Sequence, residues 1–202
     1  MNQGRSQEDT EASAEACTWS AAGLILTLVL ALMCHSCSAG EGNLRIKSER
    51  VEGVKTINGW GTGVTHGEYI VTAAHNLDGS APMYAESGGE WVACKVLIAD
   101  TDFDVAILKP SKPVSGKPVN TGISGWRMDD PYREWPIVIH GSKTFTMPVA
   151  YGQLHGVSGA GLFLDGRCLG ILSMQVRCNE TGRVFCTYCP MFVVEYLLSK
   201  IK

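Results

Sequence analysis

Three residues that lie far apart in the chain could together activate a nucleophile. His75 follows a run of β-forming and small residues, Asp104 opens a second apolar run, and Ser158 stands among glycines in the stretch HGVSGAG. A serine hydroxyl is a weak nucleophile until an imidazole accepts its proton, and the imidazole needs a carboxylate on its other nitrogen to fix its tautomer. The sequence therefore predicts a serine nucleophile with His75 as its base and Asp104 as the orienting acid.

The glycines around Ser158 indicate that another group approaches the backbone closely, because glycine has no Cβ to obstruct it. We expect the amides of Gly156 and Ser158 to face the negative oxygen of a tetrahedral intermediate. The Gly-x-Ser-x-Gly elbow of α/β-hydrolases is not satisfied, since Ala160 stands in its last place.

Two other acids, Asp100 and Asp102, compete with Asp104 for the orienting role. In a strand whose side chains alternate, all three would lie on one face. The sequence favours Asp104 because the apolar run Val-Ala-Ile-Leu follows it directly.

Short apolar runs separated by Gly, Pro and Asn predict the strands that position these residues. Many short strands with turn signals between them favour a sandwich or a barrel. A Pro- and Lys-rich stretch at 110–118 predicts a linker between two sets of strands, and Pro190 predicts the first turn of a terminal helix. The expected strands are 51–57, 61–65, 69–73, 91–99, 105–108, 137–140, 144–149, 161–164, 168–175 and 184–188.

Four motifs in this order resemble those of the trypsin/chymotrypsin superfamily of serine proteases. Residues 70–75 (IVTAAH) are similar to its apolar-Thr-Ala-Ala-His motif, and residues 104–108 (DVAIL) are similar to its Asp-x-Ala-x-Leu. Residues 156–160 (GVSGA) stand where Gly-Asp-Ser-Gly-Gly would be. Residues 170–173 (GILS) resemble the strand whose serine supports the buried aspartate. The resemblance covers about residues 43–202.

The resemblance implies an all-β protease domain with its active site in a cleft between two six-stranded antiparallel β-barrels. The barrels would span about 43–110 and 118–190, and a C-terminal helix would span 190–202. The implied activity is that of a serine endopeptidase, which cleaves polypeptides through an acyl-enzyme and needs no metal or organic cofactor.

Departures from the family pattern narrow the subgroup that the chain resembles. Val157 replaces the acid that pairs with a new N-terminus in digestive members, so that ion pair is not expected. The tight spacing of the three catalytic positions resembles HtrA-type bacterial proteases without their PDZ domain. It resembles compact proteases of positive-strand RNA viruses still more, which predicts the processing of a polyprotein.

The expected substrate-binding residues follow from the same resemblance. Gly152 stands where trypsin carries the charge that selects basic substrates, so selection of Lys or Arg is not expected. Ser173, Met174 and Gln175 should form the strand that pairs with the substrate, with Gln175 at the mouth of the pocket. His155 should line the primed side of the cleft. We expect small or uncharged residues at P1.

The first 40 residues predict a tail and a membrane segment. Residues 1–18 are small, polar and acidic, as in disordered tails, and residues 19–37 carry no charge. This segment predicts either an anchor or a cleaved signal, and the lack of a basic start favours the anchor. More basic residues follow the segment than precede it, which places the protease domain in the cytosol. Secretion after cleavage behind Ala39, or a buried core helix, is the alternative.

Composition excludes some partners and leaves the role of the cysteines open. A net charge of −3 argues against a nucleic-acid surface, and nothing indicates an oligomeric state. A hairpin disulfide between Cys178 and Cys186 is compatible with the sequence, as is a zinc site, but reduced core thiols are favoured. His66 is expected at the surface. The cysteines of the globular part are Cys94, Cys168, Cys178, Cys186 and Cys189.

Overall fold

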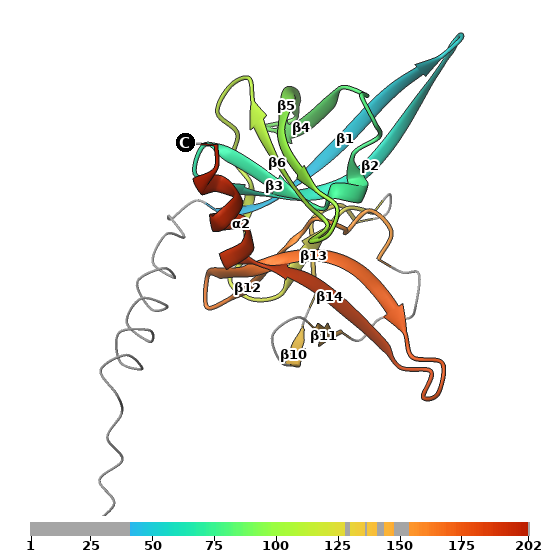
Figure 1. Cartoon of the computed structure of the whole chain (residues 1–202), viewed down its shortest axis with the longest axis vertical. Coiled ribbons are helices and arrows are strands. Elements are labelled where there is room, and N and C mark those ends of the chain that lie inside the picture. The colour runs from blue at the N-terminus through green and yellow to red at the C-terminus, as the bar shows by residue number, and fades with distance from the viewer. Residues whose placement is uncertain (1–40, 128–129, 136, 141–143, 148–153, 202) are drawn as a thin grey trace, which may run out of the picture. The chain divides into compact units, whose positions relative to one another are not determined.

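The computed structural model describes residues 41–127, 130–135, 137–140, 144–147 and 154–201 of the 202-residue chain. These residues belong to one unit, Ser36–Lys202. They form two groups of β-strands followed by a C-terminal helix (Figure 1). The mostly β architecture predicted from the sequence is confirmed.

The first group of strands closes into a six-stranded antiparallel barrel. The strands are hydrogen-bonded in the order β2-β3-β6-β5-β4-β1, and β1 pairs with β2 to close the ring. A short strand, β7 (Lys117–Pro118), adds to the edge of β1 within the stretch expected as a linker. The barrel strands are β1 (Gly42–Glu52), β2 (Lys55–His66), β3 (Tyr69–Thr72), β4 (Met83–Ser87), β5 (Glu90–Asp100) and β6 (Val105–Pro110).

The expected strand at 51–57 is wrong, because the chain reverses there. β1 and β2 form one long hairpin, with Glu52 paired to Lys55 at its end. Val51 is 68% exposed and Val54 is fully exposed, so this short apolar run lies at a hairpin tip and packs against no core. Charged side chains lie on one face of β1 along residues 43–50. The sequence therefore has no continuous apolar run there that would indicate the strand.

Strand β6 is buried on both of its faces. Val105, Ala106, Ile107 and Leu108 are all 0% exposed. Leu108 packs with the apolar residues of the first barrel, whereas Val105 and Ile107 pack in a core shared with the second group of strands and the helix. A strand covered on both faces has no place for alternating polar residues. Asp104 therefore lies directly before a fully buried strand at the junction of the two groups.

The second group of strands forms a half-barrel. Gly122 and Phe163 exchange backbone hydrogen bonds of 2.9 and 2.8 Å, which join a two-stranded sheet to a five-stranded one. Within the described residues no pairing of β9 with β10 closes a ring, so the second six-stranded barrel is not observed. The two-stranded sheet is β8 (Ile123–Gly125) and β9 (Arg133–Trp135). The five-stranded sheet is β10 (Val138–His140), β11 (Thr144–Thr146), β14 (Val184–Pro190), β13 (Arg167–Arg177) and β12 (Gly161–Leu164).

The expected C-terminal helix is observed as α2 (Met191–Ser199), directly after Pro190. Its apolar face packs into the core between the two groups of strands. The buried residues of this face are Val193, Val194, Leu197 and Leu198.

The prediction that His66 lies at the surface is wrong. It is 8% exposed at the end of β2 and lies between two carboxylates. Its Nδ1 is 2.9 Å from Oε1 of Glu41, and its Nε2 is 2.9 Å from Oε1 of Glu195 in α2. The contact with Glu41 raises the pKa of His66, although burial acts in the opposite direction. His66 thus links Glu41, directly before β1, to the C-terminal helix α2.

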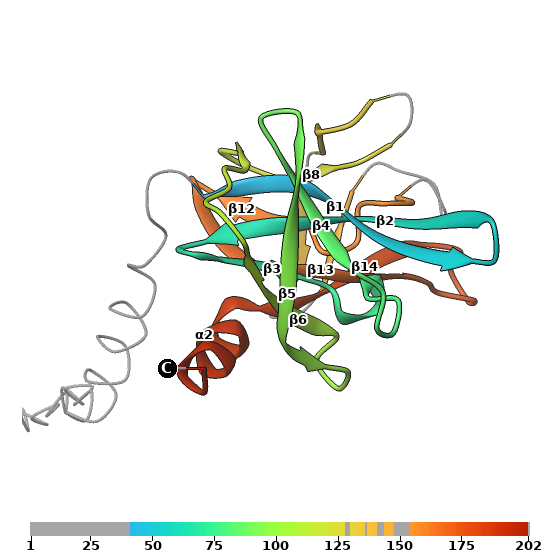
Figure 2. The same ribbon diagram turned by 90° about the horizontal axis from the view of Figure 1, so that it is seen from above.

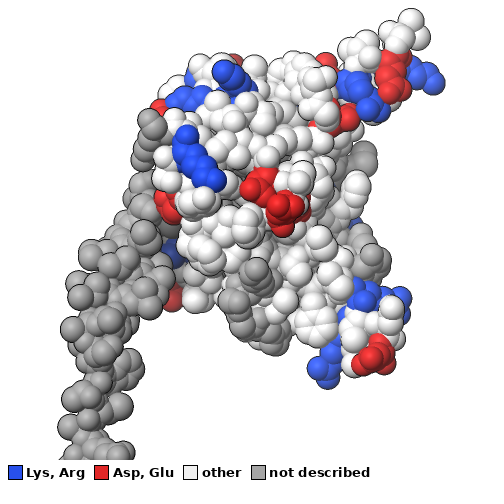
Figure 3. Space-filling model, viewed as in Figure 1, with Lys and Arg blue, Asp and Glu red and all other residues white. Residues whose placement is uncertain are grey.

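Two hairpins extend from the strand groups, one formed by β1 and β2 and the other by β13 and β14 (Figures 1 and 2). Side chains of both signs gather at their tips, and much of the face between them is uncharged (Figure 3). The charged residues at the tips are Arg50, Glu52 and Lys55 in the first hairpin and Arg177, Glu180 and Arg183 in the second.

In the described part of the chain, no helix has the length and apolar character needed to cross a membrane. The acidic tail at 1–18, the apolar segment at 19–37 and Ala39 lie outside the described residues. The membrane segment stays a prediction from the sequence.

Candidate active site

Strand β3 carries His75 to the junction of the two strand groups. Thr72 pairs with Ala106 of β6, and in an antiparallel pair the residues after Thr72 run toward those before Ala106. The buried Ala73 leads into a short 3₁₀ helix, η1 (Ala74–Asn76), which turns the chain. The His75 side chain is 47% exposed and faces a cleft.

The same pairing of β3 with β6 brings Asp104, which directly precedes β6, to His75. Its Oδ1 accepts a hydrogen bond of 3.0 Å from the His75 backbone N–H, and its Oδ2 lies 2.8 Å from His75 Nδ1. Oδ1 of Asp100 instead accepts the amides of Asp102 and Phe103, both at 3.0 Å, so Asp100 caps the turn. Asp102 is exposed. Of the three competing acids, Asp104 is the one that the structure brings to His75.

Ser173 supplies a further donor to the Asp104 carboxylate. It lies in β13, is 6% exposed, and donates its hydroxyl to Oδ2 of Asp104. Burial alone would raise the pKa of Asp104, but the hydrogen bonds from His75 and Ser173 outweigh it and lower the pKa below its usual value. An ionised Asp104 favours the tautomer with the proton on Nδ1 of His75, which leaves Nε2 as a base.

Ser158 stands in a tight turn that requires glycine on both sides. Gly156 has φ +81° and Gly159 has φ +87°, a region that other residues rarely adopt. A Cβ at Gly156 would lie 2.7 Å from the carbonyl oxygen of Trp126, and one at Gly159 would lie 2.0 Å from that of Thr62. Close approach by neighbouring backbone therefore accounts for the glycines in this stretch.

Two backbone amides of the turn have no acceptor among the described residues. The N–H of Val157 donates to Leu154 O at 3.0 Å, and that of Gly159 donates to Leu172 O at 2.8 Å. The N–H groups of Gly156 and Ser158, each directly before one of these residues, donate to no atom of the described residues. Backbone donors in a buried turn are rarely left unpaired. These two donors are therefore available to an oxygen atom of a ligand.

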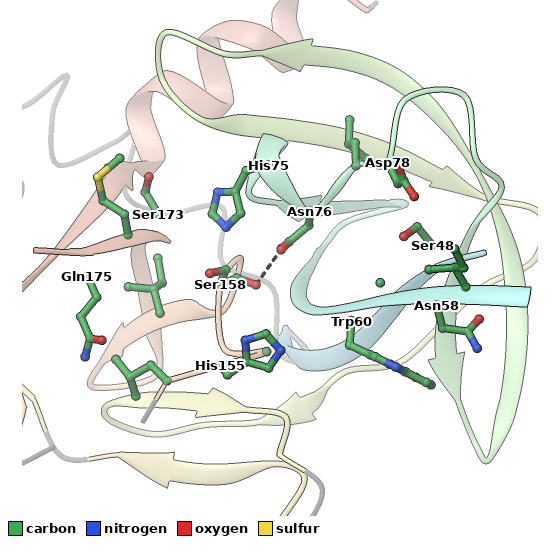
Figure 4. Close-up of a pocket in the computed structure, with 17 residues that line it drawn as sticks. Ser48, Asn58, Trp60, His75, Asn76, Asp78, His155, Ser158, Ser173 and Gln175 are labelled. Carbon is green, nitrogen blue, oxygen red and sulfur yellow. Dashed lines mark hydrogen bonds between the residues drawn. The ribbon is translucent and has the colours of Figure 1, made fainter. Parts of the chain in front are cut away.

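His75 and Ser158 line one cleft of about 680 Å³ (Figure 4). In the close-up the His75 ring lies beside Ser158, with Ser173 and Gln175 to one side and Trp60 to the other. The structure also brings four of the expected substrate-binding residues to this cleft, whereas Gly152 lies outside the described residues. The four are His155, Ser173, Met174 and Gln175.

Edges of two strands border the cleft, one at each end. Among the described residues, β13 pairs with β12 only as far as Ile171, and Met174 farther along β13 lines the cleft. β2 pairs with β3 only from Gly63 onward, and its residues 57–60 line the opposite end. Each edge offers backbone donors and acceptors to an extended chain.

Structural comparison finds solved structures with a similar fold. The Rv3671c protease from M. tuberculosis, in its active form, is similar with a TM-score of 0.61 and 20% sequence identity over 88% of this chain and 86% of that one. The chain has the fold of the trypsin-like serine proteases. A serine endoprotease from Yersinia pestis is similar with a TM-score of 0.58 and 18% identity over 79% of this chain. The chain spans 62% of the length of that enzyme. No protein-family model and no curated protein matches the sequence.

Three residues of this serine protease fold are not singled out by the sequence. Trp126 packs against Gly156 and stacks on Trp60, with ring centroids 5.0 Å apart. Asn76 reaches from η1 to the Ser158 turn. The signal that could have indicated such contacts is the Gly-Trp-Gly-Thr-Gly stretch at 59–63, where glycines again permit close approach.

The five cysteines of the described part are free thiols, so the hairpin disulfide between Cys178 and Cys186 is not formed. Cys168, Cys186 and Cys189 are buried, in agreement with the favoured interpretation. In the same part of the chain no group of His, Cys, Asp and Glu side chains could hold a metal ion, so the zinc alternative has no support.

Proposed function

We propose that the protein is a serine endopeptidase in which Ser158 is the nucleophile, His75 the base and Asp104 the orienting carboxylate. The observation that carries the proposal is the pairing of Asp104 with His75, which lines the same cleft as Ser158, next to two amides that have no acceptor among the described residues. This arrangement supplies the groups that peptide hydrolysis requires.

In the first half of the reaction, Ser158 Oγ bonds to the peptide carbonyl carbon while its proton passes to Nε2 of His75. The electron pair of the carbonyl π bond moves to the oxygen, which becomes an oxyanion. The amides of Gly156 and Ser158 donate to that oxyanion. Asp104 accepts the Nδ1–H of His75 and stabilises the imidazolium.

Collapse of the intermediate breaks the C–N bond, and His75 returns its proton to the leaving amine. The remaining acyl group is an ester of Ser158. A water molecule then attacks this ester as His75 takes one of its protons. When the second intermediate collapses, the bond between the carbonyl carbon and Ser158 Oγ breaks, His75 returns the proton to Oγ, and the acid is released.

The substrate is an extended segment of polypeptide. At Met174, beyond the end of the pairing with β12, the edge of β13 supports pairing with the residues before the cut bond, and the edge of β2 before Gly63 supports pairing with those after it. Addition of a strand to such an edge is a common mode of peptide recognition. On the β13 side the described walls include Leu154, Leu172 and Met174. These apolar walls support small or uncharged residues at P1, and a peptide-library profile dominated by charged P1 residues would contradict this.

We propose further that residues 19–37 anchor the enzyme to a membrane with the protease domain in the cytosol, where it processes a viral or virus-like polyprotein. The uncharged segment and the tight catalytic spacing support this role. N-terminal sequencing of the protein expressed with its leader provides the test. An intact segment 19–37 agrees with an anchor, whereas cleavage behind Ala39 would favour a secreted or periplasmic quality-control protease.

Cleavage of an unfolded protein tests the proposed activity. Casein should be cut by the wild type and by Ser111→Ala, which alters an exposed serine, but not by Ser158→Ala. If Ser158→Ala cleaves at the wild-type rate, the mechanism is wrong. If no variant cleaves casein or a peptide library and a fluorophosphonate leaves Ser158 unlabelled, the fold serves as a binding module.

A further inference from the structure

The side chain of Asn76 connects η1, which contains His75, to the turn that contains Ser158. It directly follows His75 in η1, and its side-chain Nδ2 donates to the carbonyl oxygen of Ser158 at 2.8 Å (Figure 4). The same Nδ2 donates to Oγ1 of Thr72 at 3.0 Å. The amide therefore joins the first barrel, which carries His75, to the turn that carries Ser158.

Gly61 provides the space that the Asn76 amide occupies. A Cβ at position 61 would lie 2.7 Å from both Cγ and Nδ2 of Asn76 and 2.9 Å from Oδ1. A side chain at position 61 would therefore force the Asn76 amide to shift. With glycine there, the amide lies against the bare backbone of β2, and from this place it reaches Ser158.

The carbonyl groups of the turn are held from the first barrel. The Ser158 carbonyl accepts a second hydrogen bond of 2.9 Å from the backbone N–H of Thr62, and the hydroxyl of Thr62 donates to the Gly156 carbonyl at 2.8 Å. Position 157 is a buried valine, which offers no carboxylate to hold the turn through an ion pair. The neutral donors of Thr62 and Asn76 fix the peptide planes on both sides of the Ser158 amide.

We propose that Asn76 is a positioning residue that keeps Ser158 in register with His75 across the junction of the two strand groups. Asn76 lines the cleft, but the role proposed for it is exerted through its hydrogen bond to the Ser158 carbonyl. The inference rests on the proposed endopeptidase function, because its effect is on the reactivity of Ser158. Loss of the amide donor should lower kcat and leave KM nearly unchanged.

The first test replaces the donor without changing its shape. In Asn76→Asp a carboxylate oxygen faces the Ser158 carbonyl, and the donor is lost while the packing on Gly61 is kept. We expect kcat on a peptide found by library profiling to decline about 10- to 100-fold, with KM within about threefold of the wild type. The rate of fluorophosphonate labelling should decline in parallel. The exposed Asn120→Ala serves as the control and should behave as the wild type.

A second pair of variants separates the hydrogen bond from packing. Asn76→Ala removes the amide and leaves a void, whereas Gly61→Ala/Asn76→Ala places a methyl group where the amide lay. The double variant should have a higher melting temperature than Asn76→Ala but an equally low kcat. If kcat recovers together with the melting temperature, Asn76 acts by packing alone and the inference is overturned. This pair also decides the matter if Asn76→Asp does not fold.

Labelling of the wild type separates failure of this inference from failure of the proposed function. A wild type that labels at Ser158, together with folded Asn76 variants that label at the same rate, overturns the role of Asn76 and leaves the endopeptidase in place. A wild type that neither labels nor cleaves overturns both.

Discussion

Replacement of Asp104 by asparagine should leave the fold intact and invert the tautomer of His75. The His75 backbone N–H donates to Oδ1 of Asp104, so the amide oxygen of an asparagine must take that position. Its NH₂ group then lies at the place of Oδ2, which is 2.8 Å from His75 Nδ1. An NH₂ group there donates to Nδ1, and the ring proton moves to Nε2. Nε2 can then no longer accept the proton of Ser158.

The magnitude follows from the two interactions that the change removes. An ion pair between the imidazolium and a carboxylate about 4 Å apart is worth about 4 kcal/mol at an effective dielectric constant of about 20. Loss of the charge-assisted hydrogen bond adds at least about 1.5 kcal/mol. Because about 1.36 kcal/mol is a factor of ten, we expect the reactivity of Ser158 to decline about 10⁴-fold.

The rate of fluorophosphonate labelling measures this decline without a known substrate, and thermal unfolding monitored by circular dichroism verifies the fold. Asp102→Asn is the matched control, because Asp102 is an exposed carboxylate two positions away and should label at the wild-type rate. A folded Asp104→Asn that labels within tenfold of the wild type would refute the assigned role, as would an equal loss in Asp102→Asn.

Three further predictions concern the support of the site and the fold. Ser173→Ala removes one donor from Asp104, so kcat/KM on a library-selected peptide should decline about tenfold, and a wild-type value would contradict the support role. Gly156→Ala, at φ +81°, distorts the proposed oxyanion turn, so labelling should slow at least about 100-fold while circular dichroism stays unchanged; unchanged labelling would exclude this turn. His66→Gln removes an imidazolium whose pKa is raised in the folded protein. Its contribution to stability is fully present below the unfolded pKa of about 6.5 and is lost as the pH rises through the raised pKa. Urea denaturation should therefore show a larger loss of unfolding free energy at about pH 6 than at about pH 9, and an equal loss at both would exclude an ion pair.

The sequence predicts the contact between His75 and Asp104 well because local patterns set it. The apolar run after Asp104 reflects a strand buried on both faces, and such a strand holds the residue directly before it at the junction of the two groups. Asp100 lacks this advantage, since the turn 100–103 separates it from the strand and uses its carboxylate as a cap. The glycines near Ser158 were also informative, because positions at which another backbone segment approaches closely require glycine.

Long-range contacts account for what the sequence does not predict. His66 looks like a surface residue because both of its carboxylate partners are distant in the chain, one before β1 and one in α2. The side chain of Asn76 acquires its role only when the Ser158 turn lies against it. The prediction of a strand at 51–57 fails because the apolar residues Val51 and Val54 lie at a hairpin tip and contact no core.

The most direct test of the central claim is to map a fluorophosphonate adduct by peptide mass spectrometry in the wild type and in His75→Ala. The account predicts one adduct, on Ser158, which forms in the wild type and is lost in a folded His75→Ala. An adduct on another serine, or labelling of Ser158 at the wild-type rate without His75, would contradict it.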